Sequence, residues 1–316
     1  MAGGTHPRFG SLQYWPRKRA EKAIPSVNWD VVKGDGKTDS ILGFIAYKVG
    51  MGTALVKDST DKSMTQGKKI YIPVTVLETP NMKIYSVRFY KNNKVLKDVV
   101  VSNDKELKRI ILAPRQPKNL DSEAPKEFDD LRLIMYSMPS QTSIKKTPDL
   151  IELAVEAKDK LAFAKSMAGK EISLKDFLKY SLLDARGLTK GKGLVGPVKR
   201  MGIGLKAHKS EKGVRRPGTL GPWHPAHTSF RVAMAGQLGM FSRVIYNNKV
   251  IGSGTISEKN INPKSGFKQY GNINSSYILL KGSVQGPQKR QILLTPSFRP
   301  TKTMAKKKYE LVELEL

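Results

Sequence analysis

The sequence predicts a mainly β protein, with strands that form a barrel or a sandwich, interrupted by an α+β insertion. Short runs rich in Val, Ile, Tyr and Phe, separated by Gly, Pro and Asn, fill residues 41–102 and 183–308, which we assign to the β body. Residues 103–184 differ in composition. They contain 15 Lys and Arg and 14 Asp and Glu, so almost none of the chain's excess positive charge lies there. We therefore assign residues 103–182 to a neutral insertion that packs on protein.

Residues 1–40 precede the first strand and predict an extended arm. Pro7, Pro16 and Pro25 exclude a helix, and the stretch HPRFGSLQYWPRKRA interleaves basic with aromatic side chains. Disordered tails usually lack aromatic residues, whereas aromatic and guanidinium planes stack on unpaired bases. We therefore favour an arm that becomes ordered on RNA over a disordered tail.

The strands of the body and the insertion follow from composition and turn residues. Asn92-Asn93 predicts a hairpin turn, and Asn247-Asn248 predicts a second turn of the same kind. The predicted strand-containing runs are 41–56, 68–80, 82–100, 132–139, 241–256, 275–284 and 289–298.

Helices are predicted only in the insertion. Thr147-Pro148-Asp149 is a typical helix start, and apolar residues recur at helical spacing from Leu150 to Ala164. Ser173 and Asp176 form the pattern of a capping box for a shorter helix over 174–182. The tail, residues 309–316, is short and amphipathic, and we expect it to dock on protein.

The basic loop, residues 187–225, is the most unusual stretch of the chain. Nine of its 39 residues are Lys or Arg, nine are Gly, and Glu211 is its only acid. A long loop of this composition lies on a surface, because burial would strand its backbone donors and acceptors. A cationic and glycine-rich backbone can approach a polyanion closely, and RNA is the natural candidate.

The charge of the whole chain agrees with this interpretation. The formal net charge is +29 with a pI near 10.1, and residues 281–308 contain eight basic residues and no acid, so we expect this segment to face phosphate as well. The chain has no cysteine, which excludes disulfides and thiolate metal sites. No window reaches about 18 apolar residues. We expect a soluble, cytoplasmic protein with no cofactor and no membrane or small-molecule partner.

Two apparent motifs do not support enzyme chemistry. Residues 191–196 match GxGxxG, but the continuation PVKRMGIG predicts no helix and the chain lacks alternating βαβ units. His224 and His227 have no carboxylate or Cys nearby in sequence, so we predict neither a metal site nor a catalytic residue.

Trp223 has two interpretations. It either anchors the loop to the protein body, or it lies at a loop tip and stacks on RNA bases, since Pro222 and Pro225 preorganise a tight turn around it. The sequence alone supports the two interpretations of Trp223 almost equally.

The motifs together resemble one family. GLTKGKGLVGPVKR, GTLGPWHPAH, AGQLGMFSRV, ILLKGSVQGPQKR, IPVTVLE and the arm make the chain similar to the universal large-subunit ribosomal protein L3 family, in its archaeal and eukaryotic branch. The resemblance implies a translation-protein-type β-barrel with an α+β insertion. It also implies binding to the 3′-terminal part of large-subunit rRNA, contacts with neighbouring ribosomal proteins and an early role in subunit assembly.

The resemblance also makes the basic loop a tryptophan finger that reaches toward the peptidyl-transferase centre. Eukaryotic members often carry a modifiable His shortly before GxWHP. Here that position is Glu211 and His208 lies offset, so no modification is carried over.

The candidate RNA-binding residues are the basic, aromatic and histidine side chains of the arm, the loop and the 281–308 segment. They are Arg8, Phe9, Tyr14, Trp15, Arg17, Lys18, Arg19, Lys190, Lys192, Lys199, Arg200, Lys206, His208, Lys209, Lys212, Arg215, Arg216, Trp223, His224, His227, Lys289, Arg290, Arg299 and Lys302. The alternative is a free-standing basic RNA-processing protein. An enzyme needs convergent acid, base or metal-ligating groups, and the cationic segments contain almost none.

Overall fold

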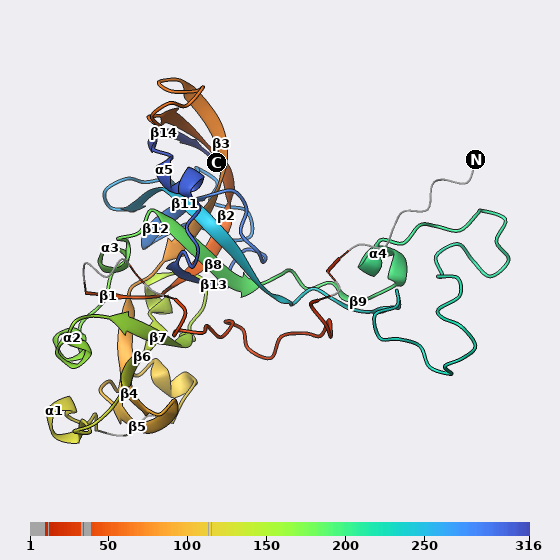
Figure 1. Ribbon diagram of the computed structural model, residues 1–316. Coiled ribbons are helices and arrows are strands. Elements are labelled where there is room, and N and C mark those ends of the chain that lie inside the picture. The colour runs from red at the N-terminus through yellow and green to blue at the C-terminus, as the bar shows by residue number, and fades with distance from the viewer. Residues whose placement is uncertain (1–9, 12, 33, 35–38, 113, 115) are drawn as a thin grey trace. The chain divides into compact units, whose positions relative to one another are not determined.

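The computed structural model describes residues 10–11, 13–32, 34, 39–112, 114 and 116–316 of a mainly β protein (Figure 1). The chain divides into two compact units, each described here by itself. The arm–loop unit comprises Met1–Ala23 and Leu188–Arg243, and the β unit comprises Ile24–Gly187 and Val244–Leu316.

Seven strands of one sheet build most of the β unit, in the order β13-β8-β11-β12-β3-β2-β14. An additional pairing between β13 and β2 closes six of them into a ring. β2 is long enough for this, because Phe44–Tyr47 pair with β13 while Thr53–Asp58 pair with β14. The strands are β2 (Phe44–Asp58), β3 (Lys69–Thr79), β8 (Leu182–Leu188), β11 (Ser242–Thr255), β12 (Ser276–Lys281), β13 (Gln291–Pro296) and β14 (Tyr309–Glu315).

The second sheet of the β unit has five strands in the order β1-β7-β6-β4-β5. They are β1 (Ser40–Ile41), β4 (Met82–Lys91), β5 (Lys94–Val100), β6 (Asp130–Ser137) and β7 (Leu150–Glu156). β4 precedes residue 103 but pairs with β6 of the 103–182 segment, and β5 pairs with β4, so residue 102 is no boundary between sheets. The predicted hairpin turn is confirmed: Asn92 and Asn93 join β4 to β5 with φ of 51° and 58°.

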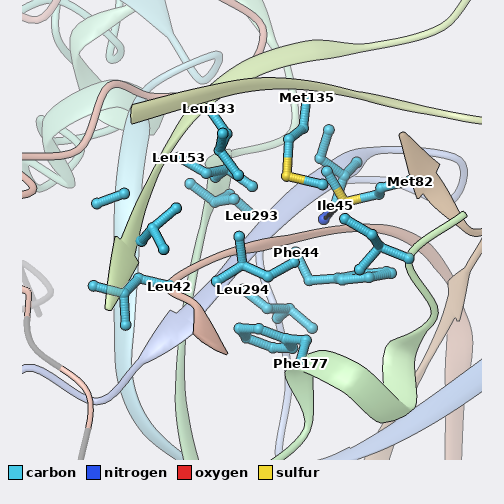
Figure 2. Close-up of a cluster of buried hydrophobic side chains, with 14 of the residues drawn as sticks. Leu42, Phe44, Ile45, Met82, Leu133, Met135, Leu153, Phe177, Leu293 and Leu294 are labelled. Atoms are coloured by element: carbon cyan, nitrogen blue, oxygen red, sulfur yellow. Dashed lines mark hydrogen bonds between the residues drawn. The ribbon is translucent and has the colours of Figure 1, made fainter. Parts of the chain in front are cut away.

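One core cluster joins the two sheets (Figure 2). Phe44 and Leu294 from the ring are fully buried in the same cluster as Leu133 and Leu153 from β6 and β7. Leu131, Leu133 and Met135 point to one face of β6 because side chains alternate along a strand. A further cluster, with Val74, Val76 and Leu279, lies among the ring strands.

The predicted helix over 150–164 is wrong in its first half. Residues 150–156 form strand β7, which pairs with β6, and the helix α2 spans only Lys160–Met167. Leu153, Ala154 and Val155 are all buried, so cross-strand pairing and burial on both faces override the helical spacing of the leucines and alanines. The helix begins at Asp159, whose carboxylate accepts hydrogen bonds from the amides of Leu161 and Ala162.

Two further local predictions need correction. The Ser173–Asp176 capping box is present, but α3 ends after Leu174–Phe177 and Leu182 already begins β8. Asn247-Asn248 makes no hairpin turn, because β11 continues through both residues. Asn247 adopts a φ of 58° inside the strand, and its amide donates to the buried Asp184 carboxylate at 2.8 Å.

The C-terminal residues dock on protein, as predicted. β14 pairs antiparallel with the second half of β2, and a helix, α5 (Lys302–Lys306), precedes it. The remaining short elements of the β unit are η1 (Leu107–Arg109), α1 (Leu120–Glu123) and η2 (Pro139–Gln141).

The arm–loop unit contains little regular structure. β9 (Gly193–Val195) pairs with β10 (Gly236–Leu238), and α4 spans Pro197–Met201. The prediction of no helix after Pro197 is wrong, because proline is well accommodated at the first position of a helix. Gly202, in the left-handed region with a φ of 67°, ends this single turn.

Candidate nucleic-acid interface

The arm and the basic loop fold together in the arm–loop unit. The amide of Ala20 donates to the carbonyl of Met240 at 2.9 Å. The Arg17 guanidinium lies 3.1 Å from the Met201 sulfur and donates to the Arg200 carbonyl at 3.4 Å, at the end of α4. Two segments that are far apart in the sequence thus share one surface.

Aromatic and guanidinium groups alternate on this surface. Arg17 lies 5.1 Å over the ring of Trp15, which meets Phe230 edge-to-face with centroids 5.9 Å apart. Arg243 lies 5.1 Å over the ring of Tyr14, which is 62% exposed, and 5.2 Å over the ring of Phe241. Such pairs hold flat groups at a surface where bases could stack.

Arg200 differs from the other loop cations because its side chain folds the loop. Its guanidinium donates to the carbonyls of Gln237 and Met234, each at 3.0 Å. Desolvation of the half-buried guanidinium lowers the pKa of Arg200 from its ordinary value. This side chain joins the end of α4 to the chain at Met234 and Gln237, and it uses two of its five N–H donors to do so.

The other basic residues of the loop are exposed. Among the residues that the structure describes, none of them forms an ion pair with a carboxylate. They are Lys190, Lys192, Lys199, Lys206, His208, Lys209, Lys212, Arg215 and Arg216. In the arm, Arg19 is exposed in the same way, whereas Lys18 lies 3.6 Å from Glu21.

Trp223 is 88% exposed and belongs to neither of the large hydrophobic clusters of the chain. His224 and His227 beside it are exposed as well. Residues 220–228 form an open hollow that Trp223 itself lines. The interpretation of Trp223 as a core anchor therefore finds no support in the packing of these residues.

The remaining candidates lie in the β unit. Lys289, Arg299 and Lys302 are exposed, with Lys302 at the start of α5. Arg290 is half-buried, and desolvation lowers its pKa from the ordinary value. Arg8 and Phe9 lie outside the described residues.

Sequence reasoning missed four residues of this surface. Phe230, Arg231, Phe241 and Arg243 follow the predicted loop end at Pro225, yet the unit continues to Arg243. They repeat the mixture of basic and aromatic residues that drew attention to the arm, and Arg231 lies 5.6 Å over the Phe230 ring. A search for that pattern along the whole chain would have found them.

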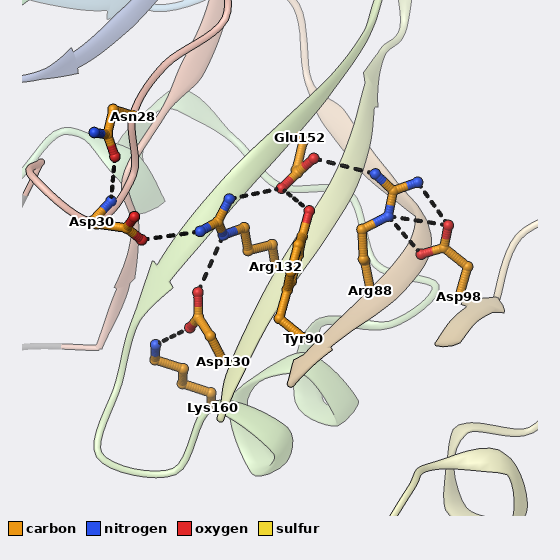
Figure 3. Close-up of polar contacts among 9 residues, drawn as sticks. All are labelled: Asn28, Asp30, Arg88, Tyr90, Asp98, Asp130, Arg132, Glu152 and Lys160. Atoms are coloured by element: carbon orange, nitrogen blue, oxygen red, sulfur yellow. Dashed lines mark hydrogen bonds and ion pairs between the residues drawn. The ribbon is translucent and has the colours of Figure 1, made fainter. Parts of the chain in front are cut away.

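Charged residues on and beside the second sheet of the β unit neutralise one another (Figure 3). Arg88 and Arg132 lie opposite each other on β4 and β6, and Glu152 accepts hydrogen bonds from both at 3.3 and 3.2 Å. Asp98 pairs with Arg88 at 2.7 Å, and Asp130 and Asp30 each pair with Arg132 at 3.1 Å. These four acids of the β unit are thus engaged with its own arginines, whereas the exposed cations of the loop have no such partners among the described carboxylates.

Fold and surface together define a class, that of basic, mainly β proteins with a surface of exposed cations and aromatic rings. The described part of the chain contains no group of three or more His, Asp and Glu that could hold a metal ion. No helix in it is long and apolar enough to cross a membrane.

The chain belongs to the ribosomal protein L3 family, whose model matches residues 2–111 and 116–316. The large ribosomal subunit protein uL3 of Methanocaldococcus jannaschii is 37% identical over 320 residues, which cover 96% of this chain and 94% of the relative. Its counterpart in Methanococcus aeolicus is 39% identical over 312 residues, with 93% and 92% covered. The resemblance seen in the sequence is confirmed, and the family is one of ribosomal structural proteins and not of enzymes.

Proposed function

We propose that this protein is a large-subunit constituent of cytoplasmic ribosomes that binds the 3′-terminal part of large-subunit rRNA and acts early in subunit assembly. The ring of strands serves as a translation-protein-type barrel, and the arm–loop unit supplies the basic loop. The loop reaches toward the peptidyl-transferase centre, with Trp223 at its tip. Neighbouring ribosomal proteins contact the neutral insertion.

The observation that carries this proposal is the distribution of unneutralised charge. Exposed cations crowd the loop, and the described carboxylates leave them unpaired. Cations of this kind displace the counterions that surround RNA phosphates, and that release drives binding. Guanidinium–aromatic pairs such as Arg17–Trp15 and Arg243–Tyr14 add flat surfaces for unpaired bases.

Salt dependence tests the phosphate contacts. The full chain is titrated with transcripts of the 3′-terminal and 5′-terminal parts of large-subunit rRNA over a range of salt concentrations. A variant with Lys199, Lys209, Arg215 and Arg216 replaced by Ala should show a log–log slope shallower by about 3, since each contact to single-stranded RNA contributes roughly 0.7. The 3′-terminal transcript should bind more tightly.

A matched control removes the same charge elsewhere. Lys94, Lys105, Lys108 and Lys126 are exposed lysines around the second sheet that form no ion pair with a described carboxylate. Their replacement by Ala should leave the slope within error of the unmodified chain. Equal effects of the two variants would show that only net charge matters, and an absence of rRNA binding would refute the proposal.

A further inference from the structure

A pocket in the β unit is lined by none of the loop residues discussed above. It has a volume of about 440 Å³ and opens between the start of β8, the end of β13 and α5. Cavities of a few hundred Å³ are the size of small-ligand sites, which is ample for a nucleobase with part of its ribose. The side chains that give it its character are Tyr180, Leu182, Pro296, Phe298, Pro300 and Ala305.

Hydrogen bonds within the β unit hold the residues around the pocket. The amide of Phe298 donates to the carboxylate of Asp184 at 3.0 Å, and Asp184 is fully buried below it. The Ser297 hydroxyl donates to the Asn247 side-chain oxygen at 2.6 Å. The Tyr180 hydroxyl lies 3.0 Å from that of Ser40. The Phe298 backbone and the Tyr180 hydroxyl are therefore held in place without a ligand.

The distribution of charge in and around the pocket indicates the kind of ligand. None of the described residues that line the pocket is charged, whereas the segment beside it is cationic. Arg299 lies 5.0 Å over the Phe298 ring, and Lys302 and Lys306 begin and end α5, the helix that contributes Ala305 to the lining. In the described part of the chain these lysines form no ion pair. An apolar, aromatic pocket with a cationic rim matches a nucleotide, which has a flat base and an anionic phosphate.

We propose that this pocket binds one unpaired nucleobase of RNA, stacked against Phe298 and Tyr180, while Arg299 and Lys302 contact its flanking phosphates. This inference rests on the proposed function, because the RNA is the one that the arm–loop unit binds. It adds a base-binding site in the β unit, where the sequence indicated only phosphate contacts. An aromatic side chain of a neighbouring protein is the competing occupant, but it would leave the cationic rim without a counterpart.

The test combines affinity with crosslinking. Phe298→Leu keeps the site apolar but removes the stacking ring, and Ala305→Trp fills the pocket from an exposed position. Each should weaken binding to large-subunit rRNA by about 5- to 150-fold with an unchanged salt slope. Lys302→Ala should reduce the slope by about 0.7 to 0.9. Irradiation at 254 nm should crosslink a nucleotide to the peptide containing Phe298, and both pocket variants should abolish that crosslink.

Tyr71→Leu is the matched control, because Tyr71 is an aromatic residue that is 61% exposed on β3, outside the pocket. It should change neither affinity nor the crosslink. If the pocket variants behave like this control while the unmodified chain still binds rRNA with a steep salt slope, the pocket proposal fails and the proposed function stands. Crosslinks from the pocket to protein in purified subunits would overturn it as well. If the unmodified chain does not bind rRNA, the proposed function itself fails.

Discussion

At the scale of single residues, neighbouring cations of the loop have different structural roles. Arg200 donates to the carbonyls of Met234 and Gln237, which follow the basic loop in the arm–loop unit. Lys199, in contrast, is exposed and has no described ion-pair partner. A guanidinium can satisfy several carbonyls at once because its donors form a fixed planar fork. The sequence presents both residues simply as loop cations.

Arg200→Ala should therefore loosen the loop, and Lys199→Ala should not. Loss of the guanidinium leaves the carbonyls of Gln237 and Met234 without a donor, which costs about 1–3 kcal/mol where they stay shielded from water. Amide hydrogen exchange over residues 192–196 and 234–241 should accelerate in the Arg200 variant alone. Equal protection in both variants would contradict the structural role of Arg200.

Trp223→Ala should leave the stability of the free protein nearly unchanged, because this side chain is 88% exposed. In ribosomes the same change should alter the chemical reactivity of rRNA bases near the peptidyl-transferase centre, since base stacking on an aromatic ring is worth about 1–3 kcal/mol. Melting curves of the free protein and chemical probing of assembled subunits measure the two effects.

Trp29→Ala provides the contrast. Trp29 is 7% exposed in the main core cluster, and its truncation should cost about 3–5 kcal/mol and lower the melting temperature. A melting temperature that falls as far for Trp223→Ala as for Trp29→Ala, together with unchanged rRNA probing, would return Trp223 to the role of an anchor.

At the scale of elements, the connection between β2 and β3 is organised by one carboxylate. Asp58 accepts hydrogen bonds from the Thr60 amide at 3.0 Å, the Ser63 hydroxyl at 2.9 Å and the Thr65 hydroxyl at 2.5 Å. These hydrogen bonds hold the pKa of Asp58 well below its ordinary value, and those from Thr60 have the largest effect. The same connection is tied to the C-terminal segment, because the Ser59 amide donates to the Lys308 carbonyl at 3.0 Å.

The pH dependence of stability follows from this lowered pKa. As pH falls below about 4, the unfolded state takes up a proton at Asp58 before the folded state does. The stability that Asp58 contributes is therefore complete above that pH and is lost as pH falls toward the folded pKa. Asp58→Asn should melt below the unmodified protein at pH 6, and the gap between them should shrink by pH 2.

Asp61→Asn is the control in the same connection, because Asp61 is exposed and has no described hydrogen-bond or ion-pair partner. It should melt like the unmodified protein at both pH values. A gap for Asp58→Asn that stays constant with pH would show that the charge of Asp58 contributes nothing to stability.

Elements were predictable where local chemistry and burial agree. Asn92-Asn93 fits its turn because Asn tolerates positive φ, and the runs on either side are rich in β-branched and aromatic residues. Asn247-Asn248 is the same pair of residues, but the Asn247 amide donates to the buried Asp184 carboxylate and strand β11 continues. Leu150–Glu156 forms a strand because β6 lies beside it. Such decisions depend on partners far along the chain, which local spacing does not reveal.

At the scale of the whole molecule, the two units differ in how much apolar surface they bury. Nearly all buried hydrophobic residues belong to the β unit, and in the described part of the arm–loop unit only Leu188 and Met201 are buried. The segregation of charge was visible in composition, since neutral and basic stretches alternate along the chain. The extent of the arm–loop unit was not visible in composition, because residues 226–243 join it through contacts of Arg200, Phe230 and Met240.

Limited proteolysis of the free protein should therefore cut the arm–loop unit first. Ordering a residue costs about 1–2 kcal/mol of backbone entropy, and two buried apolar side chains offset little of that for the whole unit. Cleavage by proteinase K, a protease of broad specificity, should begin within 10–23 and 190–231. Residues 24–32 should resist, although the sequence placed them in the arm, because Ile24, Trp29 and Val32 are buried in the main core cluster. Large-subunit rRNA should protect the early sites, since phosphate contacts supply the stabilisation that the unit lacks. Early cleavage within 24–32, or equal rates with and without rRNA, would refute this division of the chain.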